Sequence, residues 1–186
     1  PTVKNPEYFA DCFNAVQELI KKGWIMAGHD ISAGGLITTL LEMTFANVEG
    51  GMHVNLHDVA PESGDDVVKM LFAENPGVVI QVSDQHKKDL REYFEANGIG
   101  YAKIAYPTPA ERKIVVVKGD FHHEFDIDAL RDTWYKTSYL LDRNQSQNGM
   151  ARKRWLNYKK QPLEMKFADG FQGTFASLGL NPDRWK

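Results

Sequence analysis

The chain has 186 residues, of which 42% are hydrophobic, so it is long enough for one domain with a hydrophobic core plus an appendage. Its formal net charge of -3 excludes a chain that is basic throughout, as expected for coating nucleic acid or anionic membranes. The single cysteine, Cys12, excludes a disulfide framework and a cysteine-rich metal site.

Targeting and membrane signals are absent from the sequence. The N-terminus has no basic region followed by an apolar stretch, which predicts no signal peptide and a cytoplasmic protein. No hydrophobic run approaches the roughly 20 residues that span a bilayer, so we expect no membrane partner. Cys12 stands among apolar residues at helical spacing with no positive neighbour, which favours a buried, inert thiol over a nucleophile.

The first segment predicts a helix followed by a short strand. Asn5 and Pro6 combine a capping side chain with a proline at the first helical position, and Gly23 marks the end of the helix. We expect residues 24–27 to form a buried strand that delivers the polar residues after it to a ligand site. The helix shows one continuous apolar face: Tyr8, Phe9, Cys12, Phe13, Val16, Leu19 and Ile20.

Residues 27–36 read AGHDISAGGL and form the densest polar motif in the chain. An imidazole (His29), a carboxylate (Asp30) and a hydroxyl (Ser32) precede two glycines that allow a ligand close to the backbone. Such a bend can hold a metal-bound phosphate. The same residues also suit a tight turn in which Asp30 or Ser32 caps the next helix and the glycines supply unusual backbone angles. The residues alone leave both interpretations open.

A second amphipathic helix is predicted over residues 36–45, and its unpaired amino-terminal amides would favour an anion. Glu42 on this helix is interpreted as part of a solvated face. Met52, Val54 and Leu56 then alternate with polar residues in a half-buried strand pattern. His53 and His57 share a face of that strand but lie roughly 13 Å apart along it, so we expect a solvated face and no shared metal.

The middle of the chain alternates short elements. Residues 61–65 predict a loop and 67–72 a short helix with an apolar side of Val68, Leu71 and Phe72. After a Pro-Gly turn, 78–82 is typical of a central strand. Glu74 at that turn is interpreted as a carboxylate satisfied by nearby amides.

A third helix is predicted from a Ser83-Asp84 cap to Asn97-Gly98. Three strand candidates follow, which short links predict to pair antiparallel: 102–106, 113–118 and 121–127. Asp126 or Asp128 can cap the next helix. Its stripe of Leu130, Trp134, Ser138 and Leu141 is interpreted as core or interface.

The amino-acid composition changes at Arg143, where a polar, turn-rich segment begins, so we expect the folded domain to end near here. We predict a first domain over 1–143 and a basic linker or tail over 144–186. The aromatic residues Trp155 and Tyr158 lie among its cations and make nucleic-acid binding conceivable. We favour a linker that docks on another protein surface, and do not expect nucleic acid as a partner. Within residues 143–166 the basic residues are Arg143, Arg152, Lys153, Arg154, Lys159, Lys160 and Lys166.

Four stretches of the sequence resemble the phosphoribosylformylglycinamidine synthase family in its long, single-chain form. They are GHDISAGGL at 28–36, LLEMTFAN at 40–47, LFAENPGVVIQV at 71–82 and LRDTWYKTSYLLDR at 130–143. Together they cover most of residues 5–145 in one collinear order. The first is shared with a wider superfamily that includes aminoimidazole ribonucleotide synthetase and selenophosphate synthetase, and the basic tail narrows the choice to the long synthase.

The resemblance implies an α+β fold with a mixed β-sheet and packed helices, like the C-terminal domain of the aminoimidazole ribonucleotide synthetase superfamily. It also implies an auxiliary nucleotide site for ATP or ADP, in which Asp30 binds Mg²⁺ and Ser32 contacts the nucleotide. Mg²⁺ is a hard ion that suits carboxylate and phosphate oxygens. Ala33 stands where many relatives have a second Asp, so any role of that carboxylate is in doubt.

The resemblance further implies the activity of the parent enzyme, an ATP-dependent ligase and glutamine amidotransferase of purine biosynthesis. It converts formylglycinamide ribonucleotide, glutamine and ATP to formylglycinamidine ribonucleotide. This piece has no catalytic residue of its own, needs the parent's other synthetase lobes and glutaminase domain as partners, and is expected to be inactive alone. The alternatives are a lobe of another ATP-using superfamily member and a nonenzymatic binding module that uses the basic tail.

Overall fold

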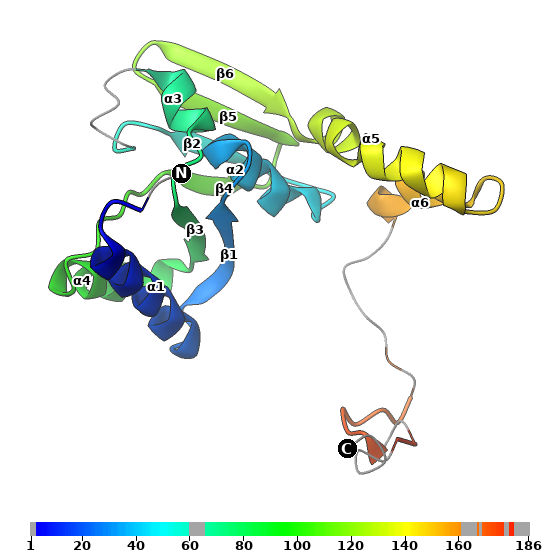
Figure 1. The fold of residues 1–186 in the computed structure, drawn as a ribbon, viewed down its shortest axis with the longest axis horizontal. Coiled ribbons are helices and arrows are strands. Elements are labelled where there is room, and N and C mark those ends of the chain that lie inside the picture. The colour runs from blue at the N-terminus through cyan, green and yellow to red at the C-terminus, as the bar shows by residue number, and fades with distance from the viewer. Residues whose placement is uncertain (1–2, 60–65, 161–166, 168, 177–178, 181–186) are drawn as a thin grey trace.

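The computed structural model describes residues 3–59, 66–160, 167, 169–176 and 179–180, so the predicted loop at 61–65 lies outside the described residues. Figure 1 shows a four-stranded sheet with two helices against it, a two-stranded ribbon beside two further helices, and a long helix that projects from the sheet. Among the described residues, no helix is long and apolar enough to cross a membrane.

The larger sheet has the strand order β4-β2-β5-β6. β2 pairs parallel with β5, whereas β4–β2 and β5–β6 are antiparallel, so the sheet is mixed and the predicted α+β class is confirmed. The hairpin through Gly119 is also confirmed. Antiparallel pairing of the first two of the three late strands is wrong, because β2 lies between them, and β4 begins three residues later than expected. The strands are β2 (Gly51–Asn55), β4 (Ala105–Thr108), β5 (Lys113–Lys118) and β6 (Phe121–Asp126).

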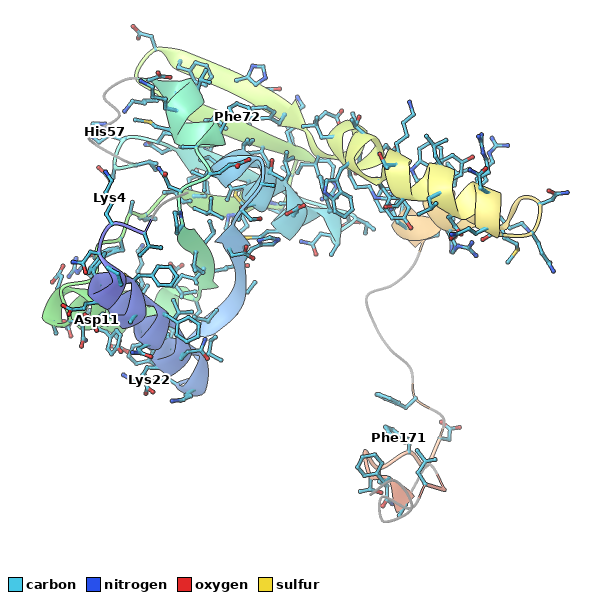
Figure 2. The ribbon with its side chains drawn as sticks, in the orientation of Figure 1. Lys4, Asp11, Lys22, His57, Phe72 and Phe171 are labelled. Atoms are coloured by element: carbon cyan, nitrogen blue, oxygen red, sulfur yellow. The ribbon has the colours of Figure 1, made fainter. Side chains whose placement is uncertain are left out.

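The main hydrophobic core lies between this sheet and helices α2 (Gly35–Phe45) and α3 (Val67–Phe72), which cover one face of the sheet in Figure 1. On α3 the expected apolar side is wrong in part, since Val68 and Phe72 are exposed and Met70 is buried beside Leu71. Figure 2 shows the Phe72 side chain at this surface. The core residues are Leu36, Ile37, Leu40, Leu41, Val54, Leu56, Met70, Leu71, Ile114, Val116 and Ile127.

A second, smaller core joins α1 (Pro6–Lys21) to α4 (Lys87–Ala96). It consists of Ala15, Leu19, Phe94 and Ile99, with Cys12 half-buried against them. The Asn5 cap is confirmed, because its side chain accepts a hydrogen bond from the Tyr8 amide at 3.0 Å. Figure 2 labels Lys22 at the other end of α1. Its Nζ lies 4.6 Å from the Trp24 ring centroid and 4.5 Å from that of Tyr93.

The ribbon of β1 (Ile25–Ile31) and β3 (Gly77–Val82) corrects three expectations. The strand expected at 24–27 is neither buried nor confined to those residues, and it continues into the polar motif as far as Ile31. β3 is not central, since it pairs only with β1 among the described residues.

The apolar face of α1 is only partly covered: Phe9, Phe13 and Ile20 are exposed, because the small second core has room for only one side of that helix.

The third predicted helix begins with a 3-10 turn, η2 (Asp84–His86), in which Ser83 makes no side-chain capping bond. Its end at Asn97 and Gly98 is confirmed. Helix α5 (Ile127–Gln145) is capped by Asp126, whose carboxylate accepts from the Ala129 amide at 2.9 Å.

The basic segment after α5 forms helix α6 (Met150–Asn157) and the turn η3 (Tyr158–Lys160), which lie against α5 (Figure 1). The Trp155 ring stacks on Tyr139 with 4.5 Å between centroids. Arg154 Nε donates to Asp142 Oδ2 at 2.9 Å, and this hydrogen bond raises the pKa of the guanidinium. The first part of the predicted tail is therefore helical and docked on its own chain, while the division of the chain at residue 143 stays a prediction.

Candidate functional site

The polar motif lies at the end of β1, next to the amino end of α2. His29 and Asp30 pair with Val79 and Val78 of β3, which fixes the ribbon beneath them. Successive residues of a strand point to opposite sides. The Asp30 side chain is accordingly 72% exposed, whereas the His29 side chain turns toward α2 and is 30% exposed.

The backbone of Asp30 is fixed while its carboxylate faces solvent. Its carbonyl oxygen accepts a hydrogen bond from Thr39 Oγ1 on α2 at 3.0 Å and lies 2.7 Å from His29 Nδ1. Thr39 is buried, so this bond from α2 to β1 is shielded from water. The Asp30 carboxylate lies 3.6 Å from the same imidazole nitrogen. A ligand can thus reach the Asp30 carboxylate while the Asp30 main chain stays in place.

Two glycines shape the turn between β1 and α2. Gly34 is the N-cap of α2 at φ +84°, and no side chain caps the helix, so the prediction of a cap by Asp30 or Ser32 is wrong. At Gly35, φ is +71° and an added Cβ would lie 2.7 Å from the Leu71 carbonyl oxygen. The unusual backbone angles predicted for the glycines are confirmed. They let α2 approach the backbone of α3 closely.

The amides of the N-cap Gly34 and of Gly35, the first residue of α2, are already occupied, which corrects the expectation of free donors at these two positions. The Gly34 amide donates to Glu74 Oε1 at 2.9 Å, and the Gly35 amide donates to the Ser32 carbonyl at 3.0 Å. Glu74 is satisfied by an amide as expected, although that amide is 40 positions away along the chain. A phosphate at this helix end therefore meets the negative charge of Glu74.

Ser32 lies two residues beyond Asp30, in the exposed turn that leads to Gly34. Its carbonyl closes the turn and its side chain faces solvent, as does the neighbouring Ala33. The two predicted ligand residues thus share one exposed edge of the molecule. Their roles stay predictions.

Glu42 is the clearest site residue that the sequence interpretation missed. The solvated-face assignment is wrong, because its side chain is 24% exposed and contacts two other elements. Its Oε2 lies 3.2 Å from His29 Nε2, and its Oε1 accepts from Trp134 Nε1 of α5 at 2.8 Å. No local sequence signal identifies these partners, since they come from a strand before α2 and a helix far behind it.

A cavity of about 520 Å³ adjoins Glu42 between α2, α5 and η3. Arg131 lines it with its guanidinium 3.3 Å from the Tyr158 ring centroid, and donates to the Trp155 carbonyl at 3.3 Å. The other lining residues are His29, Glu42, Phe45, Ala46, Trp134 and Tyr135. Glu42 contacts His29 and Trp134 within this lining, whereas Arg131 and the Tyr158 hydroxyl bond to groups outside it.

Asp128, the alternative cap considered for α5, instead anchors η3. Its carboxylate accepts from Arg112 Nε at 2.9 Å and from the Tyr158 hydroxyl at 3.0 Å, and it also pairs with Lys159. Burial raises the pKa of this carboxyl, but the hydrogen bonds from Lys159, Arg112 and Tyr158 outweigh it and hold the pKa below its ordinary value. Lys159 of the basic segment thus pairs with an acid of α5, as Arg154 does with Asp142.

The histidine expectations have mixed outcomes. His53 is half-buried and stacks on Tyr106 with 5.2 Å between ring centroids, so a solvated face is wrong for His53, whereas His57 is exposed. The described part of the chain contains no cluster of three or more His, Cys, Asp or Glu that could hold a metal.

The donor set around Asp30 fits Mg²⁺ only with help from outside this chain. Mg²⁺ is commonly held by one or two carboxylates together with phosphate oxygens and waters. Asp30 offers one exposed carboxylate, and nucleotide phosphates would supply further oxygens. The chain therefore offers part of a magnesium-nucleotide site.

Comparisons with known proteins identify the domain. Residues 1–118 match the family described as AIR synthase related protein, C-terminal domain. Phosphoribosylformylglycinamidine synthase of Homo sapiens is 33% identical over 150 residues, which is 79% of this chain and 11% of that protein. A probable chloroplastic or mitochondrial phosphoribosylformylglycinamidine synthase of Arabidopsis thaliana is 34% identical over 145 residues, 78% of this chain and 10% of that protein. The chain thus spans about a tenth of either relative.

Solved structures share the fold. The PurLQS structure from Thermotoga maritima matches with a TM-score of 0.61 and 20% identity, over 70% of this chain and 22% of that one. T. maritima PurL complexed with ATP gives a TM-score of 0.57 and 19% identity, over 65% of this chain and 21% of that one. The match over residues 1–118, more than half of the chain, shows that the chain belongs to the family of the C-terminal domain of AIR synthase related proteins.

Proposed function

We propose that this chain is a lobe of phosphoribosylformylglycinamidine synthase, the ATP-dependent carbon-nitrogen ligase and glutamine amidotransferase of purine biosynthesis. The observation that carries the proposal is the identity of 33–34% with two such synthases over more than three quarters of the chain. The family match also includes the whole β1–α2 turn, with its exposed Asp30.

The parent enzyme would convert formylglycinamide ribonucleotide, glutamine and ATP to the amidine. The amide oxygen attacks the γ-phosphorus of ATP, which releases ADP. Ammonia set free from glutamine then attacks the amide carbon, and the activated oxygen departs as inorganic phosphate. No residue of this chain is assigned to those steps.

The contribution of this lobe is part of an auxiliary nucleotide site. Asp30 would bind Mg²⁺ through its exposed carboxylate, and Ser32 would contact the nucleotide from the same turn. The fixed Asp30 carbonyl supports this assignment, because a preorganised main chain lowers the cost of placing the carboxylate. Ala33 provides no second carboxylate, so Asp30 would carry this role without help from its turn.

The cellular and domain settings are proposed on the sequence. We place the parent in the cytoplasm, although the plant relative is described as chloroplastic or mitochondrial. The segment 144–186 would lead toward a glutaminase domain. The remaining synthetase lobes would complete the nucleotide site around Asp30.

Two alternatives remain for this chain. A lobe of another ATP-using member of the superfamily would share the Asp30 site but act on a different substrate. A binding module based on the basic segment is less well supported, since Arg154 and Lys159 already pair with acids of α5.

The nucleotide site is tested by Asp30→Asn in the full-length protein that contains this chain. We expect the variant to bind Mg·ADP at least about tenfold more weakly, which corresponds to 1.4 kcal/mol. Titration calorimetry with Mg·ADP, together with the magnesium and nucleotide content of the purified protein, measures this loss.

Asp120→Asn is the matched control, because Asp120 is an exposed acid in the β5–β6 turn. It should bind Mg·ADP like the unaltered protein. Equal nucleotide content in the Asp30 and Asp120 variants would contradict the assignment. The isolated 186 residues, given ATP, ammonia and formylglycinamide ribonucleotide, should show no turnover.

A further inference from the structure

Glu42 joins three elements at a point where neither the sequence motif nor the family assignment predicts a bridge. One carboxylate oxygen faces His29 of β1 at 3.2 Å, and the other accepts from the Trp134 indole of α5 at 2.8 Å. A half-buried carboxylate is costly unless its oxygens are paired, and both oxygens of Glu42 are. This pairing gives each of its two neighbours a defined position.

His29 connects Glu42 to Asp30, its neighbour on β1. Its Nδ1 faces the Asp30 carbonyl at 2.7 Å, so this nitrogen must carry a proton and donate, because a carbonyl oxygen only accepts. Its Nε2 is held by Glu42. The imidazole is therefore fixed at both nitrogens, between α2 and the main chain of Asp30.

Trp134 is the residue of α5 that contacts Glu42. Its ring packs on Phe45 of α2 with 5.4 Å between centroids and on Tyr135 at 6.2 Å. Its indole N–H would lack this partner without the Glu42 carboxylate. A shift of β1 at Asp30 therefore reaches α5 through the His29 contact with Glu42 and the hydrogen bond from Trp134 to Glu42.

We propose that Glu42 is a positioning residue that sets Asp30 through His29 and couples the nucleotide site to α5 through Trp134. The proposal rests on the proposed function, since it takes Asp30 as the magnesium ligand. Glu42 itself touches neither metal nor nucleotide. Its effect is the placement of groups that do.

The test uses the full-length protein that contains this chain, with Mg·ADP as the probe. Glu42→Ala removes both contacts and should raise the Mg·ADP dissociation constant about tenfold. Glu42→Gln keeps an oxygen that can accept from the Trp134 indole and keeps a polar amide group beside His29 Nε2, so its dissociation constant should stay within about threefold of the original. Glu49→Ala is the control, because Glu49 is an exposed acid in the turn after α2 and should leave binding unchanged.

A second variant and a spectroscopic readout keep the test decisive if Glu42→Ala fails to fold. Trp134→Phe removes only the indole donor of a half-exposed ring, and should weaken Mg·ADP binding about threefold. The emission of Trp134 is obtained as the difference between the original protein and this variant. Mg·ADP should alter that emission in the original protein and not in Glu42→Ala. A carboxylate that only stabilised the fold would leave this ligand-linked signal in place.

The two proposals fail in distinguishable ways. If the original protein binds Mg·ADP and the Glu42→Ala and Trp134→Phe variants bind it equally well, the positioning role is overturned and the proposed function stands. If the original protein binds no Mg·ADP, the proposed function fails. The bridge is then judged without ligand, and an unchanged Trp134 emission in Glu42→Ala overturns it.

Discussion

The four-stranded sheet and the β1–β3 ribbon are built from similar apolar residues but are used differently. In the sheet, Val54, Ile114 and Val116 are fully buried under α2 and α3. In the ribbon, Met26 is 65% and Val78 is 50% exposed, and the polar motif lies on this open strand. The sheet thus supplies stability, and the ribbon presents the exposed edge that carries Asp30, which α2 holds in place through Thr39.

The largest effect should come from breaking the buried side of this comparison. Ile114→Ala removes a fully buried side chain from the main core and should lower the free energy of unfolding by about 2–5 kcal/mol. Denaturant unfolding measures the loss. Val78→Ala on the ribbon should cost less than about 1 kcal/mol, since half of that side chain already faces solvent. Equal losses would mean that the two regions share one core.

A smaller loss of unfolding free energy is expected at the start of α2, the helix that contacts both the sheet and the ribbon. Gly35→Ala forces a Cβ into the α3 backbone at a positive φ and should cost about 2–3 kcal/mol of unfolding free energy. Gly119→Ala has a similar φ of +54° but open space around the new Cβ, so only the backbone strain of about 1–2 kcal/mol applies. Thermal and denaturant unfolding compare the two variants. A Gly35→Ala cost no larger than that of Gly119→Ala would disprove the close approach of α2 to α3.

The smallest expected loss of unfolding free energy comes from a single hydrogen bond between α2 and the ribbon. Thr39→Val keeps the side-chain shape but removes the hydroxyl that donates to the Asp30 carbonyl, and should cost about 1 kcal/mol. Amide hydrogen exchange in β1 should become faster, because the ribbon loses its anchor on α2.

Thr44→Val provides the control for Thr39. Its buried hydroxyl donates only to the Leu41 carbonyl of the same helix, at 2.7 Å. It should destabilise the chain to a similar extent while leaving exchange in β1 unchanged. Faster exchange of β1 in both variants would show that α2 as a whole, and not the Thr39 bond, protects the ribbon.

Much of the local structure could be predicted from the sequence. The Asn5 cap, the Gly23 stop and the hairpin at Gly119 depend on residues within a few positions of one another, and all three are confirmed. Burial was predicted less well. Helical spacing shows that α1 has an apolar face, but it does not show which part of that face a neighbouring element covers, and Phe13 is exposed.

The site divides in the same way. Asp30 and Ser32 were identified by a compact motif, and the structure places both at one exposed edge, although their roles remain proposals. Glu42 and Glu74 were not recognised as parts of this region, since each is defined by a contact far away along the chain. A single carboxylate on a helix or in a turn carries no local signal for such a partner.

The sequence by itself determined helices α1 to α5, the tight turns and the motif that carries Asp30, because capping, glycine angles and hydrophobic period act over a few residues. Only the tertiary structure decided the parallel pairing of β2 with β5, the exposure of the ribbon, and the contacts of Glu42 with His29 and Trp134. These depend on which distant surfaces meet, and a partner across the fold outweighs any preference that a residue has from its immediate neighbours.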